Sequence, residues 1–207
     1  MIVSIPVPLP KVRYNAPTMA DSFDFLVRCY FGEGNDFLRL CVQRAYLDLS
    51  RTLRGFAGYA DGQKLREASH EHVVELVREL RIAAPSQDSF DAWHRNACTS
   101  LRLQYAQNGF NRFTFGQAQK WLNMTLKYVF VLGEERLPGY APHYAFAHPP
   151  IDNVFVGAAK AVGGPELPMP WSRLDDYDAY FALQRKYRAL FTGDAPMAAE
   201  FRLWQSA

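Results

Sequence analysis

The sequence predicts an all-α protein, with roughly eight helices arranged as two small lobes around a cleft. Apolar residues recur at three- and four-residue spacing along most of the chain, and glycines and prolines interrupt them at intervals. No stretch alternates apolar and polar residues convincingly, as a half-buried strand does. The chain has 207 residues, of which 49% are hydrophobic, so it is long enough to bury a core. We expect residues 1–207 to form a single domain.

In the first half of the chain, the sequence predicts an extended arm followed by three helices. Four prolines keep residues 1–17 from forming a helix. Thr18, with Asp21 three residues later, begins a helix that ends near Phe31, before a pair of glycines. The next two helices are expected at residues 35–54 and 63–82.

The second half of the chain predicts five more helices. Thr114 gives the clearest start, because Thr114 and Gln117 have the spacing of a capping box. Asp152 directly follows a proline-rich segment and is expected to be the N-cap of a later helix. The expected ranges are 89–108, 115–132, 152–163, 175–191 and 198–205. The two loops that flank 152–164 are rich in proline and glycine and are candidate boundaries between the lobes.

Composition excludes several classes of protein. The formal net charge is only +2, so a nucleic-acid site has to be local and not a strongly basic surface. The three cysteines lie far apart without a Cys-x-x-Cys pair, which argues against a zinc ribbon or an iron–sulfur cluster. There is no signal-peptide pattern and no apolar run of the roughly 20 residues that cross a membrane. We therefore expect a cytoplasmic protein that does not insert into membranes.

The most informative helix is the one expected at 115–132. Lys120, Asn123, Met124 and Lys127 fall on one stripe of this helix. The rest of the helix offers a separate apolar surface for packing, so the lysine stripe is expected to face a cleft. The alternative is that Lys120 and Lys127 belong to a solvated helix face.

Asp152 supplies a carboxylate that can work with Lys120. The segment Pro149-Pro150-Ile151 stiffens the chain before Asp152, and backbone N–H groups would hold the side chain of an N-cap there. A neutral lysine amine can attack a carbon atom, and a neighbouring carboxylate can stabilise positive charge that develops at a sugar. This pair has the chemistry needed to displace a base from a deoxyribose.

The pattern Gln-Lys-x-x-x-Met-x-x-Lys, with Pro-x-Asp ending 32 residues after the first lysine, resembles the archaeal 8-oxoguanine DNA glycosylase (AGOG) branch of the helix-hairpin-helix glycosylases. The resemblance implies that Lys120 forms a Schiff base and that Asp152 assists it. It further implies that four side chains hold the flipped base. These are Met124, Lys127, Glu200 and Trp204.

Three departures from that family leave the substrate open. Met124 stands where an aromatic residue is usual, and Glu200 where aspartate is expected. The N-terminal glutamine and tryptophan that enclose oxidised guanine have no match, since the first tryptophan is Trp93. The excised base is then either oxidised guanine or a hypermodified phage base such as glucosylated hydroxymethylcytosine, against which some bacteria use related glycosylases.

The loop before residue 115 is the expected contact with the DNA backbone. Arg112 could bind a phosphate together with backbone N–H groups at Thr114 and Gly116. The expected partner is double-stranded DNA with a modified or damaged base, with no obligate protein partner. No metal or organic cofactor is expected.

Two other functions remain open from the sequence. Arg66, with His70 or His72, has a spacing loosely similar to that of HEPN ribonucleases. His70 and His72 are two residues apart on an expected helix, so they point to opposite sides and cannot share a metal. The non-enzymatic alternative is a helical interaction module.

Overall fold

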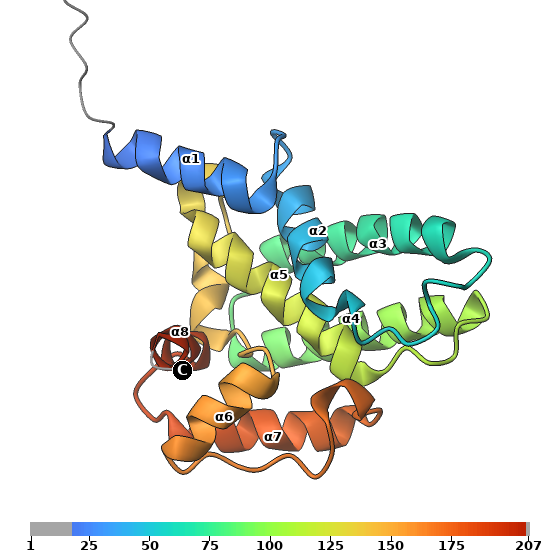
Figure 1. Cartoon of the computed structure of the whole chain (residues 1–207). Helices are drawn as coiled ribbons and strands as arrows, with labels where there is room; N and C mark the ends of the chain where they lie inside the picture. The colour runs from blue at the N-terminus through green and yellow to red at the C-terminus, as the bar shows by residue number, and fades with distance from the viewer. Residues whose placement is uncertain (1–17, 206–207) are drawn as a thin grey trace, which may run out of the picture. The chain divides into compact units, whose positions relative to one another are not determined.

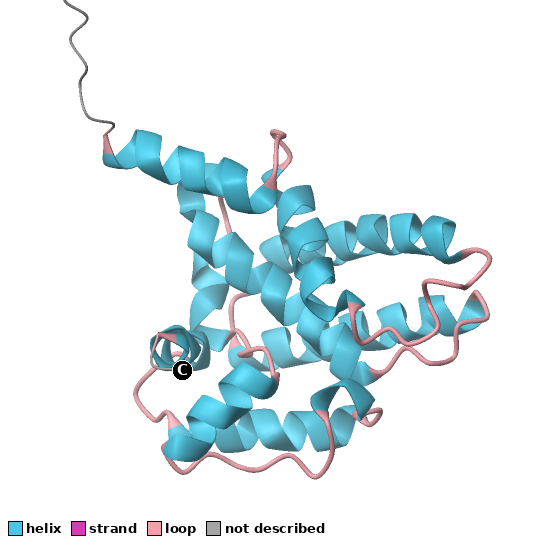
Figure 2. Ribbon diagram, in the orientation of Figure 1, coloured by secondary structure: helices cyan, strands magenta, loops and turns pink. Residues whose placement is uncertain are grey.

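A computed structural model describes residues 18–205, and in this range it contains eight α-helices, two short 3₁₀ helices and no strand (Figures 1 and 2). The all-α prediction is confirmed for this range. The arm expected at residues 1–17 lies outside it. The chain divides into two compact units, one up to Glu33 and one from Gly34 onward. Both proline-rich loops that were candidate lobe boundaries lie within the second unit.

The first unit has one described helix, α1 (Met19–Phe31). Its start has the reciprocal capping expected from the sequence. Thr18 Oγ1 accepts a hydrogen bond from the Asp21 backbone N–H at 3.1 Å, and the Asp21 carboxylate accepts one from the Thr18 N–H at 2.9 Å. Gly32 ends the helix with a φ of 92°, a value that glycine adopts more readily than other residues.

The second unit contains the remaining helices that the structure describes. Its elements are α2 (Phe37–Ser50), α3 (Gly62–Ile82), α4 (Gln87–Gln107), α5 (Phe115–Arg136), η1 (Ala141–Phe146), α6 (Asn153–Ala161), η2 (Trp171–Arg173), α7 (Tyr177–Leu190) and α8 (Pro196–Trp204). Helices α6 and α7 lie side by side (Figure 1), and the rings of Phe155 and Tyr187 are 4.7 Å apart between them. No helix in the described range is long and apolar enough to cross a lipid bilayer.

Helix α5 forms the centre of the second unit. Every residue from Gly116 to Val129 is buried, because α2, α3, α4, α7, η1 and η2 all contact this helix. Trp121 is fully buried and its indole N–H donates to the Val42 carbonyl of α2 at 3.0 Å. The sequence predicted one packed face and one face toward a cleft. The structure corrects this prediction, since neighbours enclose α5 on all sides.

The helix boundaries differ from the prediction by a few residues where a neighbouring side chain is the better cap. Asp36, not Asn35, caps α2 by accepting from the Arg39 N–H at 3.1 Å. Helix α4 begins two residues early because Ser86 caps it. Helix α5 breaks at Gly133, whose φ is 72°, and one further turn continues to Arg136. The expected end at residue 132 is therefore the end of its regular part.

Candidate active site

Lys120 and Asp152 are brought into contact. Lys120 is only 4% exposed, and its Nζ donates to Asp152 Oδ2. The other carboxylate oxygen, Oδ1, accepts from the Phe155 N–H at 2.8 Å and caps α6. The predicted N-cap is thus confirmed, and the two oxygens of one carboxylate serve α6 and Lys120 separately.

A second buried ion pair lies on the same helix. Lys127 Nζ is 2.6 Å from Glu200 Oε1 of α8, and both residues are buried. Burial raises the pKa of the Glu200 carboxyl, although Lys127 acts in the opposite direction. The charges of Asp152 and Lys120 also act on this pKa, so the two pairs form one charged cluster. Burial of both lysines rules out the solvated helix face as an explanation of the stripe.

The other two residues expected around the base differ in exposure. Met124 lies between the two lysines on α5 and is buried. Trp204, at the end of α8, is 59% exposed, and its ring centroid is 5.4 Å from Lys127 Nζ. Glu200 Oε2 is buried and has no hydrogen-bond partner among the described residues. An apolar cavity of about 260 Å³ lies beside Phe201, whose ring centroid is 5.0 Å from the same Nζ.

Gln119 fixes the segment that carries Asp152. Its side-chain amide makes two hydrogen bonds to the backbone of Ile151: Nε2 donates to the carbonyl at 2.9 Å, and Oε1 accepts from the N–H at 3.1 Å. Because Gln119 precedes Lys120 and Ile151 precedes Asp152, this contact sets the position of one site residue against the other. Gln119 is the first residue of the motif that carries the family resemblance, but the sequence predicted no role for it. Its signal is a run of polar residues within a helix that is otherwise apolar.

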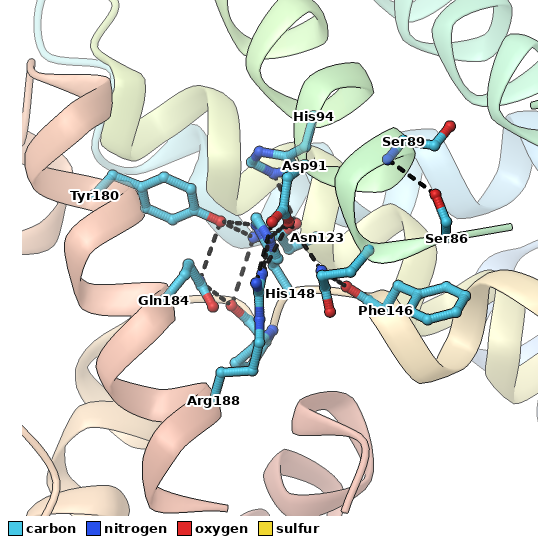
Figure 3. Close-up of polar contacts among 12 residues, drawn as sticks. Ser86, Ser89, Asp91, His94, Asn123, Phe146, His148, Tyr180, Gln184 and Arg188 are labelled. Atoms are coloured by element: carbon cyan, nitrogen blue, oxygen red, sulfur yellow. Dashed lines mark hydrogen bonds and ion pairs between the residues drawn. The ribbon is translucent and has the colours of Figure 1, made fainter. Parts of the chain in front are cut away.

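A buried polar network holds the chain just before this segment, at His148 (Figure 3). His148 joins two helices, with Nε2 2.8 Å from Asp91 Oδ1 and Nδ1 2.9 Å from the Tyr180 hydroxyl. Gln184 donates to the Pro149 carbonyl at 3.0 Å. Although burial alone would raise it, hydrogen bonds from His148 and Arg188 lower the pKa of Asp91 to about 2. The loop that leads to Asp152 is therefore held by α4, α5 and α7 together.

The two backbone donors expected to bind a phosphate, at Thr114 and Gly116, already donate within the protein. The Gly116 N–H donates to the Leu174 carbonyl at 2.7 Å, and the Thr114 N–H donates to Gln117 Oε1 at 3.0 Å. A Cβ on Gly116 would lie 1.8 Å from the Trp171 carbonyl oxygen, so this glycine allows close approach of the protein's own backbone. Phosphate binding through these N–H groups is not available in this arrangement. Arg112, whose side chain is exposed, remains a candidate contact with the DNA backbone.

The residues of the ribonuclease alternative do not converge. His70 packs edge-on against Tyr46 and Trp121, whereas His72 Nε2 is 2.7 Å from Ser100 Oγ on the other side of α3. Arg66 is exposed. No three histidine, cysteine or acidic side chains in the described range lie close enough to hold a metal ion.

Comparison with known proteins gives no match: no family model, curated protein or solved structure is similar to this chain at a significant level.

Proposed function

We propose that this protein is a DNA glycosylase of the helix-hairpin-helix superfamily that excises a modified base through a Schiff base on Lys120. The observation that carries the proposal is the buried contact between Lys120 and Asp152. Burying an ammonium group is costly unless it is paired, and a bridge of this kind is weak evidence for stability by itself. The Lys120–Asp152 pair is therefore better explained by a chemical role than by a contribution to stability.

The contact supports a balanced reaction. Lys120 loses a proton to Asp152, and the neutral amine attacks C1′ of the target nucleotide. The N–C1′ bond to the base breaks, its electron pair leaves with the base, and the base takes up a proton. Opening of the sugar ring then gives the imine on Lys120. Loss of a C2′ proton and of the 3′ phosphate would cut the strand, which is the proposed lyase step.

The second ion pair supports a pocket for the flipped base. Within the described range Glu200 Oε2 is a buried acceptor without a hydrogen-bond partner, and Trp204 presents an exposed ring next to Lys127. A base would gain a hydrogen bond from the first and stacking from the second. Because Lys120 and Glu200 are buried, the proposal requires side chains of α8 to move as the nucleotide enters. A two-lobed, glycosylase-like fold is part of the same proposal.

The proposal leaves two classes of substrate. Oxidised guanine and a hypermodified cytosine such as glucosylated hydroxymethylcytosine are both retained, and the second would make the protein a defence against phage DNA. No metal or organic cofactor is needed for the reaction as written.

A panel of duplex DNAs tests the proposal. The panel contains 8-oxoguanine, uracil, alkylated bases and glucosylated hydroxymethylcytosine, and each reaction is scored for released base and abasic sites. We expect release from at least one DNA, and loss of that release in Lys120→Gln. If no DNA in the panel loses a base and the protein instead cleaves RNA with dependence on Arg66 or His72, the proposal is wrong. An interaction module would show neither activity.

A further inference from the structure

A groove of about 530 Å³ lies at the start of α5, and arginines dominate its lining. Four of the nine lining residues are Arg51, Arg54, Arg112 and Arg173. Among the residues that the structure describes, no acidic side chain lines this groove. The formal charge of the whole chain is only +2, so four arginines in one groove form a strong local concentration of positive charge.

The four arginines are available to a ligand. All are exposed, and none makes an ion pair or a side-chain hydrogen bond within the described part of the chain. Other arginines in this unit are paired with acids: Arg102 binds Asp175 through two nitrogens, and Arg188 binds Asp91 in the same way. The groove therefore lacks the acidic partners that neutralise Arg102 and Arg188.

The groove is assembled from three distant segments that are fixed to one another. Gln117 Nε2 donates to the Thr52 carbonyl at 2.9 Å, which ties the 51–54 turn to α5. Thr114 Oγ1 donates to the Ser172 carbonyl at 3.0 Å, which ties η2 to the same helix end. A Cβ on Gly55 would lie 3.1 Å from an Arg112 guanidinium nitrogen, so Arg112 lies directly over this turn. The arginines are thus presented on a preformed support.

The chemistry of this lining selects phosphate oxygens. A guanidinium offers N–H donors in a planar fork that fits the oxygens of a phosphate. The N–H groups at the start of α5 are used internally, so anion recognition has to come from these side chains. Four unpaired guanidinium groups in one groove suit a ligand with several anionic groups in a row better than a single small anion.

We infer that this groove binds successive phosphodiester groups of a DNA strand. The inference rests on the proposed function, and it names where the strand runs. Thr114 borders the groove and Lys120 is six residues further along α5, which corresponds to about 9 Å of helix. A strand rises about 3.4 Å per nucleotide along the duplex axis. The groove then holds phosphates two or three steps from the nucleotide that reaches Lys120.

Binding to an unmodified DNA duplex tests the groove without any base excision. Affinity is measured by fluorescence anisotropy at several salt concentrations for the unchanged protein, Arg54→Gln, Arg112→Gln and the double variant Arg112→Gln/Arg173→Gln. Loss of one phosphate contact should lower the slope of log K against log salt by about 1, and weaken binding about tenfold. The double variant should lose about 2 from the slope.

Arg81→Gln is the matched control, because Arg81 is an exposed arginine at the end of α3 and does not line the groove. This variant should bind DNA with the affinity and the salt dependence of the unchanged protein. Circular dichroism checks that each variant is folded, and Arg112→Glu, which reverses one charge, should weaken binding further than Arg112→Gln.

The groove assignment is overturned if the groove variants bind like Arg81→Gln, or if an RNA duplex of the same sequence binds more tightly than the DNA. This failure is distinct from failure of the glycosylase proposal. If the groove variants bind DNA normally and the protein still releases a base through Lys120, only the assignment of the groove is wrong. Groove variants that lose binding, in a protein that releases no base, would leave a DNA-binding protein without the proposed reaction.

Discussion

Asp152 uses its two carboxylate oxygens for different tasks: one caps the N-terminus of α6 and the other binds Lys120. Asp152→Asn separates these tasks. Asparagine is as good an N-cap as aspartate, so α6 stays capped, but the buried Lys120 ammonium loses its counter-ion and the free energy of unfolding should fall by about 3 kcal/mol. Asparagine cannot accept the Lys120 proton, so base release should slow by about 10²- to 10⁴-fold. Single-turnover release and urea unfolding measure the two effects.

Asp176→Asn is the control for Asp152→Asn. Asp176 caps α7 by accepting from the Asp178 N–H at 2.9 Å and takes no part in the proposed reaction. It should leave the release rate unchanged. An Asp152→Asn protein that releases base at the original rate would contradict the role of this carboxylate.

The pair Lys127–Glu200 is buried, so removal of one member leaves an uncompensated charge. Lys127→Met and Glu200→Leu should each reduce the free energy of unfolding by about 3–5 kcal/mol, and the double variant should lose much less than their sum. The exposed pair Lys160–Glu166 is the control, with side chains 63% and 71% exposed. Its loss should leave the free energy of unfolding almost unchanged, because both groups are exposed to water. Additive losses in the buried pair would show that the two groups do not interact.

At the scale of elements, the start of α5 depends on a backbone contact with the segment that includes η2. Gly116 lies so close to Trp171 that a methyl group cannot fit unless this segment moves. Gly116→Ala should therefore destabilise the protein by about 1–3 kcal/mol. The same substitution at Gly157 in α6, where a Cβ meets nothing within 4 Å, should stabilise it by about 0.5–1 kcal/mol.

Urea unfolding of both glycine variants measures the expected loss of stability at Gly116 and the expected gain at Gly157. Equal effects at the two positions would mean that the Gly116–Trp171 approach does not constrain α5. Because η2 also contributes Arg173 to the arginine-lined groove, Gly116→Ala should additionally weaken DNA binding.

At the scale of the whole molecule, five buried or half-buried histidines make stability depend on pH. Burial, helped by Arg66, lowers the pKa of His70 to about 4, and burial also lowers the pKa of the other four, which are His72, His94, His143 and His148. In the unfolded chain a histidine titrates near 6.5. The unfolded state therefore binds more protons below this pH, so stability is full above about 6.5 and falls as the pH drops toward 4.

The urea midpoint at pH 7 and pH 5 measures this dependence. His70→Phe keeps the ring contacts with Tyr46 and Trp121 and removes a ring nitrogen that has no partner in the described structure. This variant should show a smaller decrease between the two pH values. Asp91, with a pKa of about 2, loses its contribution only below about pH 3.8 and does not affect this window. A midpoint that rises toward pH 5 would contradict the neutral state of these histidines.

The sequence was sufficient for features that depend on neighbouring residues. Thr18, Thr114 and Asp152 act as N-caps as predicted, because a cap is read from the residues within one turn of it. The pairing of Lys120 with Asp152 was also predicted, through a resemblance of motifs. The enclosure of α5 was not, since the polar residues on its stripe suggest exposure unless their distant partners are known.

The contacts that could not be predicted from the sequence join segments that lie far apart in the chain. Gln119 meets Ile151, and Asp91 meets Arg188, only once several helices have packed. The arginine-lined groove likewise needs three segments to converge. Helical periodicity places a residue on a face of its own helix but does not identify the side chain that it meets.

The central claim is that Lys120 attacks the sugar, and covalent trapping tests it most directly. The protein is incubated with the DNA that loses a base in the panel, borohydride reduces the imine, and peptide mapping by mass spectrometry locates the adduct. We predict one nucleotide-bearing peptide with the added mass on Lys120, and no adduct in Lys120→Gln. An adduct on Lys127 or another residue, or base release without any adduct, would contradict the proposed mechanism.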